Sequence, residues 1–180
     1  MSWNLVRLDE VAATPWRNGG GVTRELLAWP GADDWRVRMS VAEVATDGPF
    51  SRFDGVQRWF AVLDGAGVRL RVDGNSQLIT RTSEPFAFDG GAATDCELVD
   101  GPTQDFNLML RGAGGRIARV RGMHSAECRA RQLVALYAGR DGARLAGQAI
   151  APDVLAWRIL DGDSLLQIES KSALWMEVTP

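Results

Sequence analysis

The stretch from Trp16 to Glu25 places an aromatic ring, an amide, three glycines and a carboxylate within ten residues. Consecutive glycines such as Gly19 to Gly21 are costly to order, because glycine loses more backbone freedom on folding than any other residue. They are used where the backbone passes close to another group or turns through positive φ. This composition is typical of a small-molecule site, and a tight turn is the alternative interpretation of the glycines.

Polar residues recur at alternate positions in three short runs. The pairs are Thr23 with Glu25, Arg38 with Ser40, and Asp105 with Asn107. Alternate residues of a β-strand lie on one face. Polar members of such strands ordinarily face water, but if these faces point into a barrel they converge on one pocket.

An arginine in such a pocket predicts an anion site, because a guanidinium can hold a carboxylate through two parallel hydrogen bonds. Arg58 or Arg38 is expected to clamp the ligand, amides to bind neutral polar groups, and aromatic rings to form apolar walls, Phe53 among them. The candidate ligand-binding residues are Trp16, Asn18, Gly19, Gly20, Thr23, Glu25, Arg38, Ser40, Phe50, Ser51, Arg58, Asp105, Asn107 and Met109.

Other kinds of chemistry find less support. His124 is the single histidine, which excludes three-histidine and two-histidine metal sites, so no metal and no other cofactor is expected. The chain has no G-x-S-x-G elbow and no phosphate-binding P-loop. If the protein is an enzyme, Glu25 or Asp105 is the candidate general base.

The composition limits which partners the protein can bind and in which cellular compartment it is expected. The net charge of −3 gives no general attraction to nucleic acid. The chain contains no run of 18 apolar residues, so no membrane span is expected. The N-terminal residues lack the pattern of a secretory signal, and two cysteines, Cys96 and Cys128, fit a reduced compartment. We therefore expect a cytoplasmic protein.

Turns and short alternating runs indicate the elements that must position these residues. Asp-Gly, which favours tight hairpin turns, occurs eight times. Alternating runs lie at 35–41, 68–72 and 105–111, which predicts an all-β sandwich or barrel. Residues 125–137 could form one helix or a further strand.

A weak internal repeat suggests two halves. Residues 59–70 resemble 132–145, and 85–91 parallel 152–157, with chance similarity as the alternative. The glycine-rich segment 112–115 is expected to join the halves. We predict an N-terminal lobe at 1–112, which holds the pocket, and a C-terminal lobe at 113–180 in one compact unit.

Four ordered motifs resemble the HutD/Ves family. They are Trp16 to Glu25, residues 35–42, the run from Gly48-Pro49-Phe50-Ser51 through Phe53 and Gly55 to Arg58, and Cys96-Glu97-Leu98 followed by 105–109. The resemblance covers residues 3–122 best. It implies a bicupin, two β-barrel lobes of the RmlC-like cupin superfamily in one chain, and a bacterial association with histidine-utilisation operons or with stress and cold responses. It also implies binding of a pathway intermediate, such as formylglutamate or urocanate, to moderate flux. The single histidine departs from the pattern of metal-dependent cupins.

Three functional hypotheses follow. The first, which we prefer, is a non-metal bicupin that binds a small carboxylated metabolite in a regulatory role, with no nucleic-acid or membrane partner. The second is a metal-independent isomerase or hydrolase, and the third is a protein-interaction module without a small ligand. A homodimer is compatible with each of them.

Overall fold

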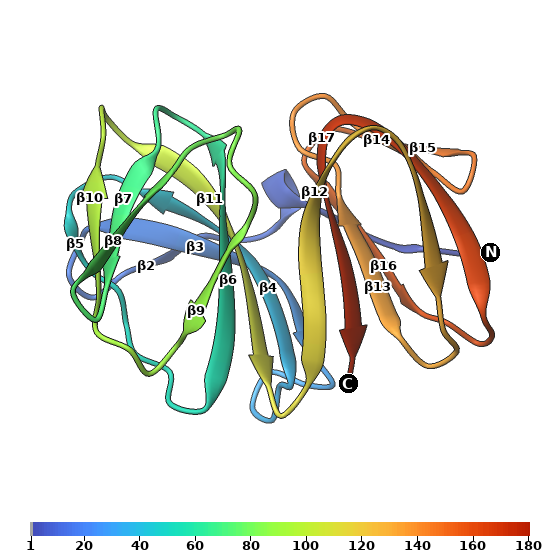
Figure 1. Ribbon diagram of the computed structural model, residues 1–180, viewed down its shortest axis with the longest axis horizontal. Coiled ribbons are helices and arrows are strands. Elements are labelled where there is room, and N and C mark those ends of the chain that lie inside the picture. The colour runs from blue at the N-terminus through green and yellow to red at the C-terminus, as the bar shows by residue number, and fades with distance from the viewer. Residues whose placement is uncertain (1) are drawn as a thin grey trace. The chain divides into compact units, whose positions relative to one another are not determined.

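The computed structural model describes residues 2–180, which form strands β1 to β17 and one short 3-10 turn (Figure 1). The predicted all-β class is confirmed. Residues 125–137 belong to two strands rather than to a helix, because β12 and β13 both pair with β17 and Arg131 between them has φ of 68°. No helix within the described chain is long and apolar enough to cross a bilayer.

The chain divides into two compact units, of which one is formed by residues 12–112. Its strands are β2 (Thr14–Pro15), β3 (Gly21–Trp29), β4 (Val37–Val44), β5 (Gly48–Pro49), β6 (Val56–Asp64), β7 (Val68–Val72), β8 (Asn75–Ile79), β9 (Phe86–Asp89), β10 (Thr94–Leu98) and β11 (Thr103–Arg111). They form a six-stranded sheet in the order β2-β3-β4-β11-β6-β9 and a four-stranded sheet in the order β5-β10-β7-β8. We call this unit the N-terminal lobe.

Apolar side chains from both sheets form the core of the N-terminal lobe. Phe60 and Val62 of β6 pack in one buried cluster with Leu70 of β7, Ile79 of β8 and Cys96 of β10. Leu70 and Cys96 alternate with exposed polar neighbours along β7 and β10, as a strand with one face in a core requires. The alternation seen in the sequence therefore indicates which side chains pack in the core between the two sheets.

The second unit contains residues 113–180 together with residues 2–11, and we call it the C-terminal lobe. Its elements are β1 (Asn4–Arg7), the 3-10 turn η1 (Leu8–Glu10), β12 (Gly114–Cys128), β13 (Leu133–Tyr137), β14 (Ala143–Leu145), β15 (Gln148–Ile150), β16 (Val154–Ile159) and β17 (Ser164–Thr179). The sheet runs β1-β16-β13-β17-β14-β15, and β12 pairs with β17.

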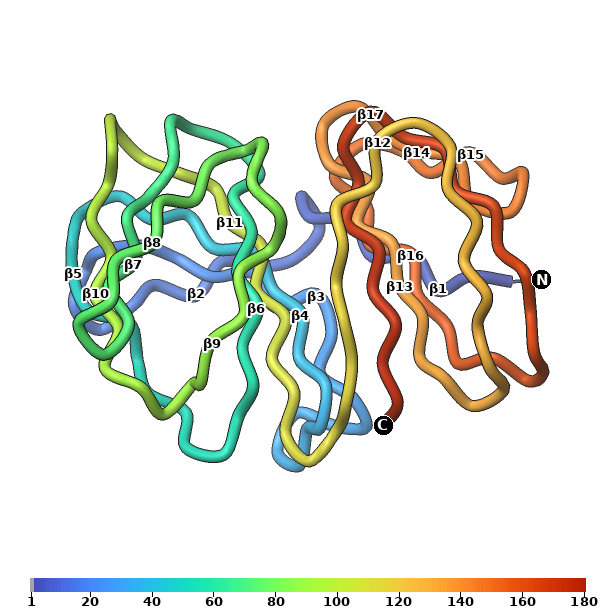
Figure 2. Tube along the Cα trace, in the orientation of Figure 1, coloured from blue at the N-terminus to red at the C-terminus, as the bar shows by residue number. Residues whose placement is uncertain are grey.

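The N-terminal residues correct the predicted boundary of the first lobe. β1 lies beside β16, with Leu5 opposite Ala156, and the Leu8 amide donates to the carbonyl of Asp153 (Figure 2). Residues 2–11 thus belong to the C-terminal lobe, and Met1 lies outside the described residues. Sequence order misplaces this segment because a strand joins whichever sheet edge offers it hydrogen bonds. Of the expected linker, Gly114 and Gly115 belong to β12.

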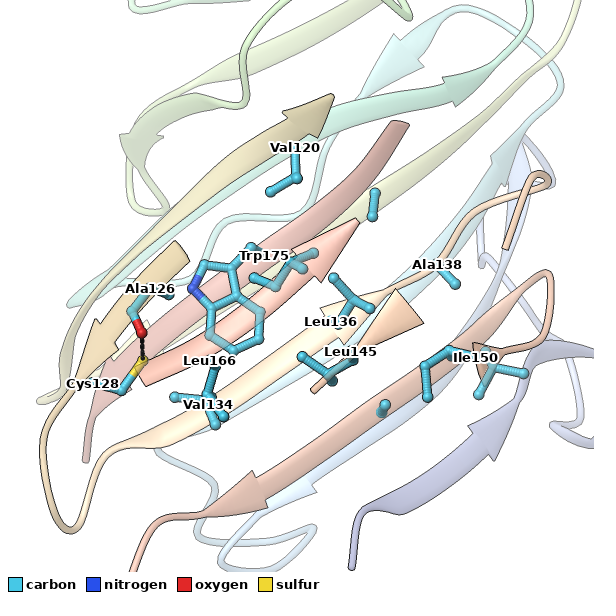
Figure 3. Packing of buried hydrophobic residues seen from close by; sticks show 14 of the residues in the cluster. Val120, Ala126, Cys128, Val134, Leu136, Ala138, Leu145, Ile150, Leu166 and Trp175 are labelled. Carbon is cyan, nitrogen blue, oxygen red and sulfur yellow. Dashed lines mark hydrogen bonds between the residues drawn. The ribbon is translucent and has the colours of Figure 1, made fainter. Parts of the chain in front are cut away.

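The core of the C-terminal lobe is filled by aliphatic side chains around Trp175 (Figure 3). Leu136 of β13, Leu145 of β14 and Leu166 of β17 each lie in this buried cluster. Its strands also support the predicted repeat: β6 pairs with β9 and β11, and β13 pairs in the same way with β16 and β17. The repeated segments occupy equivalent places in the two lobes.

The triple glycine turns the chain into β3. Gly19 has φ of 73° and its amide donates to the Trp16 carbonyl, which closes the turn. Gly21 opens β3, where a Cβ atom would lie 2.3 Å from the Glu43 carbonyl oxygen of β4. The third glycine is therefore required by the close approach of two strands.

Gly21→Ala is expected to lower the free energy of unfolding by about 1–3 kcal/mol, because the methyl group must push backbone apart. Urea denaturation of both proteins measures the change. Gly114→Ala is the matched control, since that strand glycine has open space around the position of a Cβ. Equal midpoints for Gly21→Ala and Gly114→Ala would contradict the steric explanation.

Candidate functional site

A cavity of about 600 Å³ opens in the N-terminal lobe on one face of the six-stranded sheet. That volume is within the range of small-molecule sites. Its walls are formed by Thr14, Pro15, Trp16, Arg17, Asn18, Thr23, Glu25, Arg38, Ser40, Ala42, Val44, Pro49, Phe50, Ser51, Phe53, Arg58, Phe60, Asn107 and Met109.

Strand register brings the polar pairs of the sequence into two rows across the sheet. Glu25 of β3 lies opposite Ser40 of β4, which lies opposite Asn107 of β11. In the next row Met109 of β11 lies between Arg38 of β4 and Arg58 of β6. Side chains remote in the sequence meet because alternate residues of each strand share the face that lines the cavity.

Arg58 is the most deeply buried charged side chain among those that line the cavity, with 5% of its surface exposed. Its Nη2 donates to Asn107 Oδ1 at 2.9 Å, and its Nη1 donates to the Ser51 carbonyl at 3.2 Å. A guanidinium has five N–H donors, and Nε is buried without a hydrogen-bond partner in the described chain. No carboxylate within residues 2–180 forms an ion pair with Arg58.

Aromatic rings replace the missing counter-ion only in part. The Arg58 guanidinium lies 5.0 Å from the centre of the Phe88 ring, 5.4 Å from that of Phe50 and 5.6 Å from that of Phe53. Ring faces attract a cation, but more weakly than a carboxylate does. Burial, with a further contribution from the positive charge of Arg38, lowers the pKa of Arg58 to about 10. A negative ligand would relieve both effects.

Arg38, in contrast, has a partner of opposite charge. Its Nε donates to Glu25 Oε2 at 2.5 Å, and both side chains line the cavity. A β-bulge at Leu26 shifts the register of β3 directly after Glu25. Bulges re-aim side chains near functional sites, and this one lets Glu25 face the cavity while both Leu26 and Leu27 are buried.

The turn before β3 presents the aromatic and amide groups. Trp16 Nε1 donates to Thr23 Oγ1 at 2.7 Å, and the Gly20 amide donates to Asn18 Oδ1 at 2.9 Å. Gly19 and Gly20, both predicted to contact ligand, do not line the cavity. The Gly20 amide is used by Asn18, so these glycines shape the turn that holds Trp16 and Asn18.

Asp105 is the third predicted residue that does not reach the cavity. It follows the alternation of β11, but it lies next to Ala42 and Val62 in the core, with 0% of its surface exposed. Thr103 donates to its Oδ2 at 2.7 Å, and Oδ1 is buried without a partner in the described chain. A general base at Asp105 would have no access to a ligand in this cavity.

The other eleven predicted residues all line the cavity. The residues that the sequence reasoning missed are Thr14, Pro15, Arg17, Ala42, Val44, Pro49 and Phe60. Ala42 and Val44 continue the alternation of Arg38 and Ser40, so that signal was present in the sequence. Thr14 and Pro15 form the edge strand β2, which has no alternating pattern to identify it.

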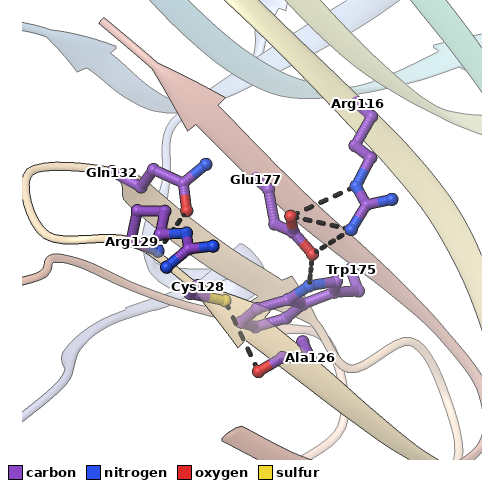
Figure 4. A network of polar contacts seen from close by, with 7 residues as sticks. All are labelled: Arg116, Ala126, Cys128, Arg129, Gln132, Trp175 and Glu177. Carbon is purple, nitrogen blue, oxygen red and sulfur yellow. Dashed lines mark hydrogen bonds and ion pairs between the residues drawn. The ribbon is translucent and has the colours of Figure 1, made fainter. Parts of the chain in front are cut away.

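The C-terminal lobe shows how a buried charge looks when it is compensated. Both carboxylate oxygens of Glu177 accept hydrogen bonds from Arg116, at 2.9 to 3.1 Å, and Oε1 also accepts from Trp175 Nε1 (Figure 4). Such a fully paired group is explained by folding alone. Arg58 lacks an equivalent carboxylate, which makes its position a candidate for ligand binding.

The cavity does not suit a metal ion of the kind that many cupins hold. Glu25 is its one carboxylate and already pairs with Arg38, and the walls contain neither histidine nor cysteine. Across residues 2–180 no group of three or more histidine, cysteine or acidic side chains is placed to bind a metal.

Asp105 makes stability depend on pH. Burial raises the pKa of its carboxyl from 3.8 to about 7, against a smaller opposing effect of the Thr103 hydrogen bond. Between these values the folded protein holds a proton that the unfolded chain has lost. The free energy of unfolding therefore falls as pH rises from 4 to 7.

Asp105→Asn should remove this slope and stabilise the protein at pH 8, by an amount on the order of 3 kcal/mol. Chemical denaturation at pH 5 and at pH 8 measures both effects. Asp100→Asn, at an exposed turn, controls for the loss of a carboxylate. The same pH slope in wild type and Asp105→Asn would show that Asp105 does not titrate in this range.

Comparison with known proteins gives the family context. A relative from Pseudomonas putida, an uncharacterised 21.2 kDa protein in the hutC 3′ region, is 39% identical over 107 residues, which is 58% of this chain and 56% of that protein. Protein Ves from Escherichia fergusonii is 38% identical over 98 residues, 53% of this chain and 51% of that protein. The aligned part thus spans about half the length of these curated relatives.

Solved structures agree over the whole chain. The structure of HutD from Pseudomonas fluorescens SBW25 superposes with a TM-score of 0.89 at 27% identity and covers 99% of this chain and 98% of that one. The Escherichia coli protein YhhW, a pirin at 8% identity and a TM-score of 0.69, shows the cupin-like fold alone and covers 98% of this chain and 97% of that one. The HutD family model matches residues 8–178. This chain, a bicupin, therefore belongs to the HutD family.

Proposed function

We propose that the N-terminal lobe binds a small metabolite through a carboxylate group, with Arg58 as the principal anion contact. One observation carries this proposal: a guanidinium faces a cavity of about 600 Å³ while it is buried and lacks a carboxylate partner in the described chain. A buried unpaired charge is unfavourable for folding. A site that binds an anion explains why the residue is there.

The neighbouring groups suit an acid with further polar atoms. Three N–H groups of Arg58 remain after its hydrogen bonds from Nη1 and Nη2: one on Nε and one on each Nη. Asn107 accepts a hydrogen bond from it and lies opposite Ser40 on the sheet, and the rings of Trp16 and Phe50, in edge-to-face contact, form the apolar wall. This mixture fits an organic acid better than an inorganic anion.

The family context suggests which acids to test. The Pseudomonas putida relative is named for its place near hutC, and the HutD family has its name in common with the histidine-utilisation genes. Formylglutamate and urocanate, intermediates of histidine degradation, are both carboxylates of suitable size. We propose binding of such an intermediate in a regulatory role.

Wild-type protein at a ligand concentration of 100 times Kd should be stabilised by about 2.7 kcal/mol, which raises Tm by about 5–10 °C. Thermal unfolding with formylglutamate and with urocanate measures the shift. Arg58→Met should lose it, and should melt no lower than wild type without ligand, because it removes an unpaired buried charge. Arg58→Lys should keep only a small shift, since lysine lacks the planar fork.

Arg69→Met serves as the matched control, because this arginine is exposed on β7 and outside the cavity. It should retain the full ligand shift. An absent shift in wild type with both acids, or an equal shift in Arg58→Met, would rule out the proposed role of Arg58.

A further inference from the structure

The side-chain oxygen of each cavity asparagine already accepts a hydrogen bond. Asn107 Oδ1 accepts from Arg58, and Asn18 Oδ1 accepts from the Gly20 amide. Both partners are donors only, so these hydrogen bonds fix which end of each amide is the oxygen. The NH2 ends take no part in these hydrogen bonds, so each offers donors to a ligand.

The hydroxyl of Thr23 likewise accepts a hydrogen bond from the protein and has a donor left for a ligand. Its Oγ1 accepts from Trp16 Nε1 at 2.7 Å, so its own proton is free to point elsewhere. Together with the arginines, these groups make a wall that mainly donates hydrogen bonds. Such a wall suits the oxygen atoms of an acid or of an acyl group.

Glu25 is the exception among the cavity side chains. Its Oε2 accepts from Arg38 Nε, whereas no residue of the described chain donates to its Oε1. The side chain is 39% exposed and lines the cavity. Oε1 is thus a charged acceptor that faces a wall of donors, and strands β4 and β11 lie between Glu25 and Arg58 in the sheet.

We infer that Glu25 determines the specificity of the cavity by accepting a hydrogen bond from an N–H group of the ligand. The inference rests on the proposed function, because it assumes a carboxylate at Arg58. The ligand class is then an acid that also carries an N–H donor, such as an N-acylamino acid or an imidazole acid. A ligand with an ester oxygen in place of that N–H cannot donate to Glu25, and the lone pairs of the ester oxygen repel the carboxylate. Such a ligand therefore binds more weakly.

The alternative is that Glu25 only holds Arg38 in position. Glu25→Gln separates the two roles. The side-chain oxygen of glutamine can still accept from Arg38, but the free carboxylate oxygen is replaced by an NH2 group. Loss of the N–H preference is expected only if Glu25 itself contacts the ligand.

A matched pair of probes tests the inference. N-acetylglycine and acetoxyacetate are isosteric acids that differ by an N–H group in place of an oxygen. Calorimetric titration of wild type should give about tenfold or greater preference for N-acetylglycine. In Glu25→Gln the two affinities should lie within about threefold of each other, with acetoxyacetate bound no more weakly than by wild type.

Two further variants complete the design. Glu43→Gln removes a carboxylate that pairs with Arg24 outside the cavity, and it should keep the wild-type preference. Arg38→Met removes the ion-pair partner but leaves the Glu25 carboxylate, so it should also keep a preference for N-acetylglycine. If Arg38→Met instead behaved as Glu25→Gln does, Glu25 would be a positioning residue.

The outcomes also separate this inference from the proposed function. Equal affinity of wild type for the two probes overturns the role of Glu25 and leaves carboxylate binding at Arg58 intact. Persistence of the full preference in Glu25→Gln assigns the N–H recognition to another group and overturns the inference as well. Binding of neither probe by wild type counts against a carboxylate site, and both proposals fall.

Discussion

The buried guanidinium of Arg58 is the constraint on which the rest of the N-terminal lobe depends. It is held by Asn107 and the Ser51 carbonyl, it is surrounded by three phenylalanine rings, and it lacks a carboxylate partner in the described chain. Moving an ion out of water costs several kcal/mol unless its surroundings compensate. A lobe selected for stability alone would place an apolar residue here, so the cost points to an anion that comes from outside the chain.

The contrast between the two lobes supports that interpretation. Both use the same strand pairing, with β6 between β9 and β11 in one and β13 between β16 and β17 in the other. In the C-terminal lobe the corresponding face carries Trp175 in a packed core and Glu177 in a complete pair with Arg116. The same strand arrangement thus carries a fully paired charge, Glu177, in one lobe and a charge without a carboxylate partner, Arg58, in the other. That difference, and not the fold, points to function, because unrelated activities can share one fold.

The two arginines on the cavity face of the six-stranded sheet differ in how their charges are compensated. Glu25 neutralises Arg38, whereas Arg58 lies across Met109 from Arg38 and stays unpaired. An incoming acid therefore meets one available buried cation beside one internal ion pair. This arrangement is narrower than a basic patch, and it accounts for a specific small-molecule site in a chain of net charge −3.

Much of this could be predicted from the sequence, because strand periodicity and turn chemistry are local. Alternation identified the strands and grouped Arg38 with Ser40 and Asn107 with Met109, and the ordered motifs identified the family. Alternation could not show where along a face the open cavity ends and the packed core begins, so Asp105 was expected at the site although it lies in the core. It also could not show that β1 pairs with β16, or that Glu25 keeps one free oxygen. Pairing partners, cavity depth and hydrogen-bond saturation depend on contacts between residues far apart in the chain, and only the tertiary structure decides them.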